Sequence, residues 1–202
     1  MSISYNGGRR GRPPSNRKFR SRFLIVCEGE RTEPNYFKGF HLPAKVADIR
    51  GIGANTVSLV EKTIELRSEG DYDSVWCVFD RDSFPVQNFN EALQLAERNG
   101  INVAYSNEAF EIWYLLHFHY HNAALDRTQY AGKIKAEIGR PYQKNDPEMY
   151  SLLRGRMNDA IRNAQKLLTN YEPLNPAQDN PSTTVHVLVE ELRKNLPGQP
   201  SE

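Results

Sequence analysis

Three short apolar runs, each followed by polar residues and a helix-like segment, most constrain the fold of this chain. They span residues 22–27, 74–79 and 101–105. The middle run has five consecutive apolar residues that include β-branched and aromatic side chains, which predicts a strand buried on both faces. Strand-like runs that alternate with helix patterns are typical of βαβ units and a parallel sheet. We therefore expect an α/β fold.

Weaker patterns complete this expected core. An alternating segment at residues 45–49 predicts an additional, outer strand. Helices are expected at residues 35–40, 56–69, 89–99 and 107–118, because apolar residues recur there at helical spacing between capping residues and glycines. Gly51 and Gly53 lack the third glycine of a dinucleotide-binding fingerprint, so they predict a turn. The core is thus a sheet of about four parallel strands flanked by helices.

Strand patterns stop after residue 122, and helical spacing continues at residues 126–138 and 149–168. A last helix is expected after Ser182 or Thr183, either of which can act as its N-cap. We divide the chain into a flexible basic arm (1–22), an α/β core (23–121), a C-terminal helical extension packed on the core (122–196) and a short tail (197–202).

The arm has a charge unlike that of the rest of the chain. Residues 1–22 contain seven of the 26 basic residues and no acidic residue, which leaves 19 basic against 25 acidic residues elsewhere. Arginine- and glycine-rich arms commonly neutralise nucleic-acid phosphates, although a solubilising terminus is the alternative. The arm residues expected to bind nucleic acid are Arg9, Arg10, Arg12, Arg17, Lys18 and Arg20.

The sequence also predicts a cytoplasmic protein without a membrane partner. It has no apolar run of eighteen residues, and no apolar segment precedes Phe23, so neither a membrane span nor a secretory signal is expected. Cys27 and Cys77 both lie inside apolar runs. We expect them to be reduced core residues, because a disulfide or a zinc site needs a different environment.

Acidic residues follow three of the predicted strands. Glu28 follows the first, Asp80 and Asp82 follow the central one, and Glu108 or Glu111 follows the last. The carboxyl ends of parallel strands meet at one edge, about 4.8 Å apart between neighbours. Packed carboxylates repel one another without a cation, and they are ligands of hard cations. The pattern predicts one or two Mg²⁺ or Mn²⁺ ions; alternatively, Asp80 and Asp82 only solvate a strand end.

An ordered set of motifs over residues 20–195 resembles the RloB-like proteins. Its Glu-Gly and Asp-x-Asp pieces are also similar to the two motifs of the Toprim domain, which primases, topoisomerases and OLD-type nucleases share. The motifs are Val26-Cys27-Glu28-Gly29-Glu30-x-Thr32-Glu33-x-x-Tyr36-Phe37, Phe79-Asp80-x-Asp82, Ser106-Asn107-x-x-Phe110-Glu111-x-Trp113-x-x-x-His117-Phe118, Tyr142-x-Lys144 and Asn180-Pro181-Ser182-Thr183.

The resemblance implies a Toprim-like fold and a Mg²⁺-dependent nuclease of prokaryotic defence against phage, such as abortive infection. Genes of this kind often lie in restriction–modification loci beside an ABC- or AAA-type ATPase partner. By position, Glu28 would be a general base or metal ligand, and Asp80 and Asp82 the metal-binding pair. Glu111 would be a further acid of the catalytic site, and Lys144 would stabilise charge on the cleaved phosphate.

Three functions are compatible with these features. The first is a metal-dependent nuclease acting on DNA or RNA. The second is a non-catalytic nucleic-acid-binding or regulatory subunit that requires a partner ATPase. The third is another metal-assisted phosphoryl-transfer enzyme that acts on nucleotides. The intact Glu28, Asp80 and Asp82 favour the first and third, and the basic arm favours nucleic acid over nucleotides. The oligomeric state is open, with a homo-oligomer as one option.

Overall fold

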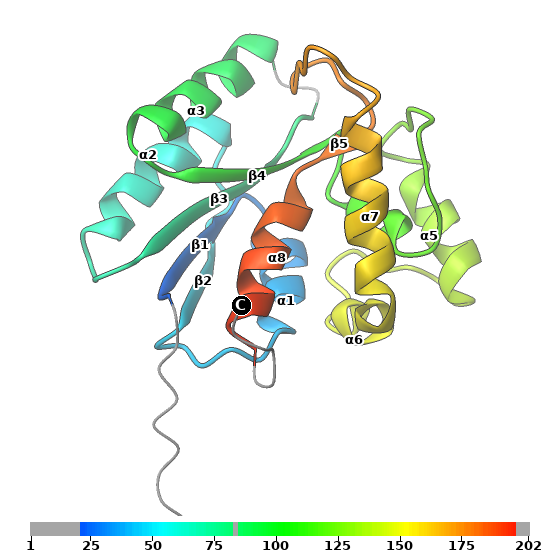
Figure 1. Ribbon diagram of the computed structural model, residues 1–202, viewed down its shortest axis with the longest axis horizontal. Helices are drawn as coiled ribbons and strands as arrows, with labels where there is room; N and C mark the ends of the chain where they lie inside the picture. Colours follow the sequence, from blue (N-terminus) through cyan, green and yellow to red (C-terminus); the bar gives the residue numbers. More distant parts are fainter. Residues whose placement is uncertain (1–20, 83–84, 197–202) are drawn as a thin grey trace, which may run out of the picture.

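A five-stranded sheet forms the centre of the computed structural model, which describes residues 21–82 and 85–196 (Figure 1). Four strands run parallel, in the order β2-β1-β3-β4. They are β1 (Phe23–Cys27), β2 (Ala47–Gly51), β3 (Ser74–Asp80) and β4 (Asn102–Asn107). The four predicted strands are therefore confirmed, with β3 in the middle of the sheet and β2 at one edge.

The fifth strand comes from the C-terminal part of the chain. β5 (Ser182–Thr183) pairs antiparallel with β4, so that Ser106 lies opposite Thr183. The prediction that strands end at residue 122 was wrong, because a two-residue strand is too short to give a sequence pattern. Side chains hold it in place: the buried Thr183 hydroxyl donates to the Tyr105 carbonyl at 3.0 Å and shares a 3.0 Å hydrogen bond with the Ser106 hydroxyl.

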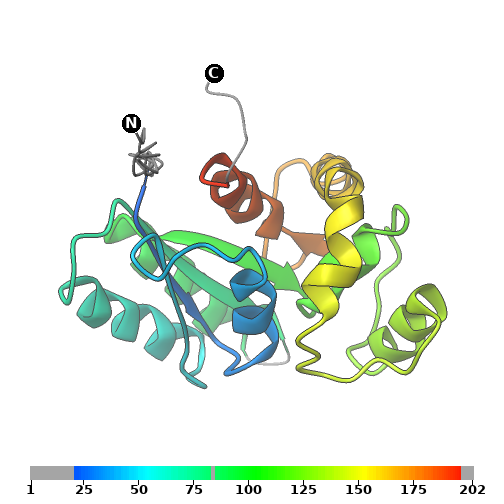
Figure 2. The same ribbon diagram turned by 90° about the horizontal axis from the view of Figure 1, so that it is seen from below.

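Helices cover both faces of the sheet (Figures 1 and 2). α2 (Thr56–Arg67) and α3 (Val86–Arg98) lie on one face. On the other face lie α1 (Thr32–Lys38), α4 (Glu111–Leu116), α7 (Met157–Leu168) and α8 (Val185–Lys194). Alternate residues of β1 enter the two cores, Ile25 one and Leu24 the other, and both are fully buried. Burial on both faces explains why the central strands are continuous apolar runs.

A cluster of aromatic rings fixes α1 and α4. Tyr36 and Phe37 of α1 contact Phe110, which directly precedes α4, with ring centroids 5.7 and 5.9 Å apart. Trp113 of α4 contacts the Tyr36 ring from another side. All four are at most 2% exposed, so the core determines where these two short helices lie.

Several helix boundaries differ from the predicted ones. α4 begins at Glu111 and not at residue 107, because Asn107 is the last residue of β4. α5 (Tyr130–Ile138) begins after residue 126, because Asp126 forms a turn by accepting hydrogen bonds from Thr128. The helix predicted at 149–168 is divided into α6 (Met149–Leu153), a 3-10 turn (Arg154–Arg156) and α7. The division includes Gly155, a residue with low helix propensity.

The remaining predictions concern the ends and the compartment. Cys27 and Cys77 are free thiols buried in β1 and β3. Among the described residues, every helix is too short or too polar to cross a bilayer. The predicted tail at 197–202 lies outside the described residues. So do the basic arm residues Arg9, Arg10, Arg12, Arg17, Lys18 and Arg20.

We expect Thr183→Val to lower the free energy of unfolding by about 1–3 kcal/mol, because it removes the three buried hydrogen bonds of the Thr183 hydroxyl while keeping the side-chain shape. Urea unfolding monitored by circular dichroism would measure the change. Thr169→Val is the matched control, since Thr169 is exposed and its loss should change stability by less than about 0.5 kcal/mol. Equal effects of the two substitutions would contradict a stabilising role for β5.

Candidate functional site

A pocket of about 650 Å³ opens at the carboxyl ends of β1 and β3. Segments that are far apart in the sequence form its wall: the turn after β1, the start of α1, the loop between β2 and α2, the end of β3, the start of α4, the turn before α5 and the loop before α6. All five residues predicted for the catalytic site line this pocket. They are Glu28, Asp80, Asp82, Glu111 and Lys144.

Glu28 is fixed by the ladder between β1 and β3. Its backbone N–H donates to the Val78 carbonyl at 2.8 Å, one residue beyond the end of β1. Its carboxylate Oε2 accepts the backbone N–H of Asp80 at 3.1 Å. Burial raises the pKa of Glu28 to about 7; the Asp80 N–H opposes this shift, and the Asp82 charge adds to it. Glu28 therefore changes its protonation state near neutral pH.

Asp80 and Asp82 face a cation from a distant segment. Arg127, in the turn before α5, contacts Asp80 Oδ2 at 2.8 Å and Asp82 Oδ2 at 3.6 Å. Asp80 is the last residue of β3 and is 9% exposed. Burial raises its pKa well above the usual range, the Glu33 and Glu111 charges raise it further, and Arg127 acts in the opposite direction. This aspartate is thus held among like charges, with a guanidinium in contact.

Glu33, in the first turn of α1, adds a buried acid to the pocket. It is 6% exposed, and its Oε2 has no hydrogen-bond partner. Gly29 makes room for it, since a Cβ at that position would come within 2.2 Å of the same oxygen. Burial and the Glu111 charge raise the pKa of Glu33, while Lys144 and Arg127 lower it. An unpaired buried carboxylate oxygen is costly, which indicates a site suited to a cation.

Glu111 enters the pocket from the start of α4 and is 7% exposed. The Tyr142 hydroxyl donates to its Oε1 at 3.0 Å. Burial and the Glu111 charge raise the pKa of Tyr142, so this tyrosine stays a donor. Tyr142 thereby links the acid to the loop that carries Lys144, the residue of the Tyr142-x-Lys144 motif that lines the pocket.

Lys144 is exposed on the rim, and its neighbour Asn145 fixes the loop. Thr32 Oγ1 donates to Asn145 Oδ1 at 2.8 Å, and Asn35 Nδ2 donates to the Asn145 carbonyl at 3.1 Å. Asn145 has a φ of 77°, a left-handed conformation that asparagine tolerates better than most residues. The loop between α5 and α6 is therefore tied to α1, and Lys144 is kept beside the acids.

The charges of the pocket suit a divalent cation, but their present positions do not converge on one point. Six carboxylates and three cationic side chains line it, and all six acids offer the hard oxygen ligands that Mg²⁺ prefers. Within residues 21–82 and 85–196, no three acidic, histidine or cysteine side chains lie close enough together to hold one metal ion. The acids therefore offer suitable ligands for Mg²⁺, but the Arg127 guanidinium contacts two of them, Asp80 and Asp82.

The sequence analysis gave no functional role to Glu33 or Arg127, two charged residues that line this pocket. Glu33 lies within the motif that resembles the RloB-like proteins, and its spacing of five from Glu28 was the available signal. Arg127 lies 47 residues from Asp80, in a turn with no strand or motif beside it. No local pattern indicates such a long-range contact, so only the tertiary fold identifies Arg127.

The raised pKa of Glu28 predicts that the free energy of unfolding of the metal-free wild type and that of the metal-free Glu28→Gln variant differ by an amount that depends on pH. Between the usual value of 4.5 and about 7, the unfolded state releases the Glu28 proton while the folded state retains it. Stability from this group therefore falls as pH rises through that window. Relative to the variant, the wild type should lose about 1–3 kcal/mol of unfolding free energy.

Urea unfolding at several pH values with EDTA would measure this difference. Comparing the two proteins cancels groups with the opposite trend, such as the buried His117, whose pKa burial lowers to about 4. A wild type that gains stability over Glu28→Gln between pH 4.5 and 7 would contradict the assignment of Glu28 as a buried acid with a raised pKa.

The comparisons with known proteins agree with these motifs. The family model described as RloB-like protein matches residues 23–192, which includes every described residue of the pocket. No curated protein and no solved structure matches the chain. Because the match extends over most of the sequence, the chain belongs to the family of RloB-like proteins.

Proposed function

We propose that this RloB-like protein is a divalent-metal-dependent nuclease that hydrolyses phosphodiester bonds. The observation that supports it most is the meeting of Glu28, Asp80 and Asp82 in one pocket, at the ends of two adjacent parallel strands. Buried Glu33 and Glu111 increase the negative charge there. Such a concentration of acids is hard to maintain without a cation.

Five of the six acids of the pocket have a place in this proposal. Asp80 and Asp82 would hold Mg²⁺ or Mn²⁺, and Glu33 or Glu111 would offer further oxygen ligands. A bound divalent cation would supply an activated water and neutralise charge on the phosphate. Glu28 is suited to accept a proton from the attacking water, because its pKa is about 7 and its Oε2 is fixed by the Asp80 N–H.

The cationic side chains would act on the phosphate itself. Lys144 lies on the rim, in a loop that Asn145 ties to α1, so little rearrangement is needed to bring it to a substrate phosphate. Arg31 lines the same pocket from the start of α1 and is exposed. We assign non-specific contacts with the nucleic-acid backbone to the basic arm at residues 1–22.

The family membership supports a role in prokaryotic anti-phage defence, in a restriction-associated locus with an ATPase partner. Within residues 21–82 and 85–196, α5 and α6 pack into the same hydrophobic core as α1, α4, α7 and α8, so the described elements include no separate domain for recognising a substrate. An ATPase partner would then supply recognition or control of the nuclease.

A second candidate is a non-catalytic nucleic-acid-binding or regulatory subunit of the same complex. Two observations favour it. Arg127 contacts Asp80 and Asp82, and no group of three potential metal-ligating side chains in the described part of the chain has the spacing of a metal site. In that case the ion pairs would be purely structural. Metal-dependent cleavage separates the two candidates.

We expect the purified protein to cleave nucleic acid with Mg²⁺ or Mn²⁺ but not with EDTA. Plasmid DNA, single-stranded DNA and total tRNA would identify the substrate class on gels. Glu28→Gln and Asp80→Asn should each reduce the rate roughly a hundredfold or more, because each removes a group that acts on the water or holds the metal.

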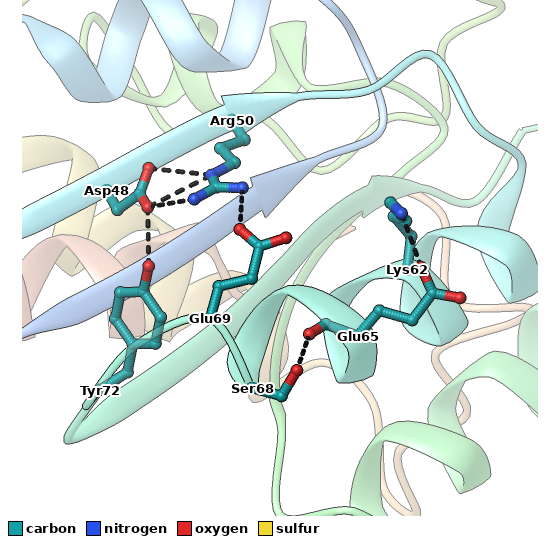
Figure 3. A network of polar contacts seen from close by, with 7 residues as sticks. All are labelled: Asp48, Arg50, Lys62, Glu65, Ser68, Glu69 and Tyr72. Atoms are coloured by element: carbon teal, nitrogen blue, oxygen red, sulfur yellow. Dashed lines mark hydrogen bonds and ion pairs between the residues drawn. The ribbon is translucent and has the colours of Figure 1, made fainter.

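Asp48→Asn is a matched control for Asp80→Asn. Asp48 lies on β2 and takes part in a surface network with Arg50, Glu69 and Tyr72, away from the pocket (Figure 3). This variant should cleave like the wild type. If no substrate is cleaved, with or without the partner ATPase, the non-catalytic subunit becomes the better assignment.

A further inference from the structure

Arg127 contacts the carboxylates at which the proposed function places the metal. We propose that Arg127 is an internal counter-ion that competes with the divalent cation for Asp80 and Asp82, and so sets the metal concentration at which the pocket is loaded. This inference rests on the proposed function, since it concerns the regulation of the same site. It assigns a task to a residue that none of the sequence motifs contains.

The contacts of Arg127 are those expected of a competitor. Its Nη2 donates to Asp80 Oδ2 at 2.8 Å, and its Nη1 is 3.6 Å from Asp82 Oδ2. The same two oxygens are available ligands for a hard cation. A guanidinium and a divalent ion repel each other strongly at such short range, so both cannot occupy this place.

The guanidinium also acts on acids that it does not contact. Its positive charge lowers the pKa of Glu28 and of Glu33, and the Glu111 charge stabilises the cationic form of Arg127 in turn. Arg127 therefore interacts with five of the six acids of the pocket. This explains how the described structure tolerates carboxylates that turn toward Arg127 instead of toward a common point.

The backbone at Arg127 is fixed, whereas its side chain is free to leave. Leu125 and Tyr130 are buried on either side of the turn, and Asp126 closes it by accepting hydrogen bonds from Thr128. The Arg127 side chain is 42% exposed, against 10% for Asp80. The guanidinium side of this ion pair is partly exposed to solvent, so a divalent ion can displace it without refolding of the turn.

The alternative is that Arg127 positions Asp80 and Asp82 for the metal. The two roles predict opposite effects of removing the charge. If Arg127 positions the aspartates, its loss weakens metal binding because the ligands lose their orientation. If Arg127 competes, its loss tightens metal binding because one cation no longer has to be displaced. Metal affinity therefore distinguishes them without any measurement of cleavage.

The test is titration calorimetry of Mn²⁺ into full-length wild type, Arg127→Ala and Arg127→Gln at about pH 8, where most carboxylates are ionised. We expect both variants to bind Mn²⁺ roughly tenfold more tightly than the wild type, a modest factor because the ion pair is partly exposed.

Thermal unfolding gives a second measurement. In EDTA, Arg127→Ala should unfold at a lower temperature than the wild type, and added Mn²⁺ should raise the unfolding temperature of Arg127→Ala by more than it raises that of the wild type. Arg127→Gln keeps the test possible if Arg127→Ala fails to fold.

Arg50→Ala is the matched control, since Arg50 also bridges two acids, Asp48 at 2.8 Å and Glu69 at 2.9 Å, and is similarly exposed at 34% (Figure 3). It should leave Mn²⁺ affinity unchanged. One outcome would overturn the competition but not the proposed function. In that outcome, Asp80→Asn loses Mn²⁺ binding, and the Arg127 variants bind Mn²⁺ no more tightly than the wild type does. No Mn²⁺ binding to the wild type or to any Arg127 variant would overturn the proposed function as well. Binding to the Arg127 variants alone would support the competition.

Discussion

The acidic pocket depends on the pairing of two adjacent parallel strands, β1 and β3. Their ladder continues one residue past β1, where the Glu28 N–H donates to Val78, and the side chain of Glu28 then accepts the Asp80 N–H. Two carboxylates are thereby brought together, although their charges repel. The apolar burial of both strands on two faces supplies the stability that keeps them there.

The two faces of the sheet contribute differently to this arrangement. The side covered by α2 and α3 is a core of ordinary aliphatic and aromatic packing, and it contributes little to the pocket. The opposite side has the aromatic cluster around Tyr36 and Trp113, which fixes α1 and α4. Because Glu33 and Glu111 lie in the first turns of these short helices, ring packing decides where two of the buried acids lie.

Local patterns were sufficient to predict the four parallel strands and five of the residues that line the pocket. β1 and β3 are apolar runs, and Glu28, Asp80 and Asp82 lie at their carboxyl ends, so strand topology alone brings these acids to one edge. The same patterns could not predict β5 or the contact between Arg127 and Asp80. Thr183 meets Ser106 across 77 residues, and Arg127 meets Asp80 across 47 residues. Contacts of this kind depend on how the later helices return to the sheet, which no short pattern encodes.

The return of the chain at β5 has a consequence for the order in which the protein becomes complete during synthesis. Ser182 and Thr183 pair with Asn107 and Ser106, the residues that end β4 just before Glu111 enters the pocket. α8 then covers β4 from the same face as α4. A nascent chain that has not yet reached residue 183 lacks this support at one edge of the sheet. The acids of the pocket are encoded early in the sequence. Their final arrangement requires β5, which directly precedes α8, the last described helix, and is therefore synthesised late.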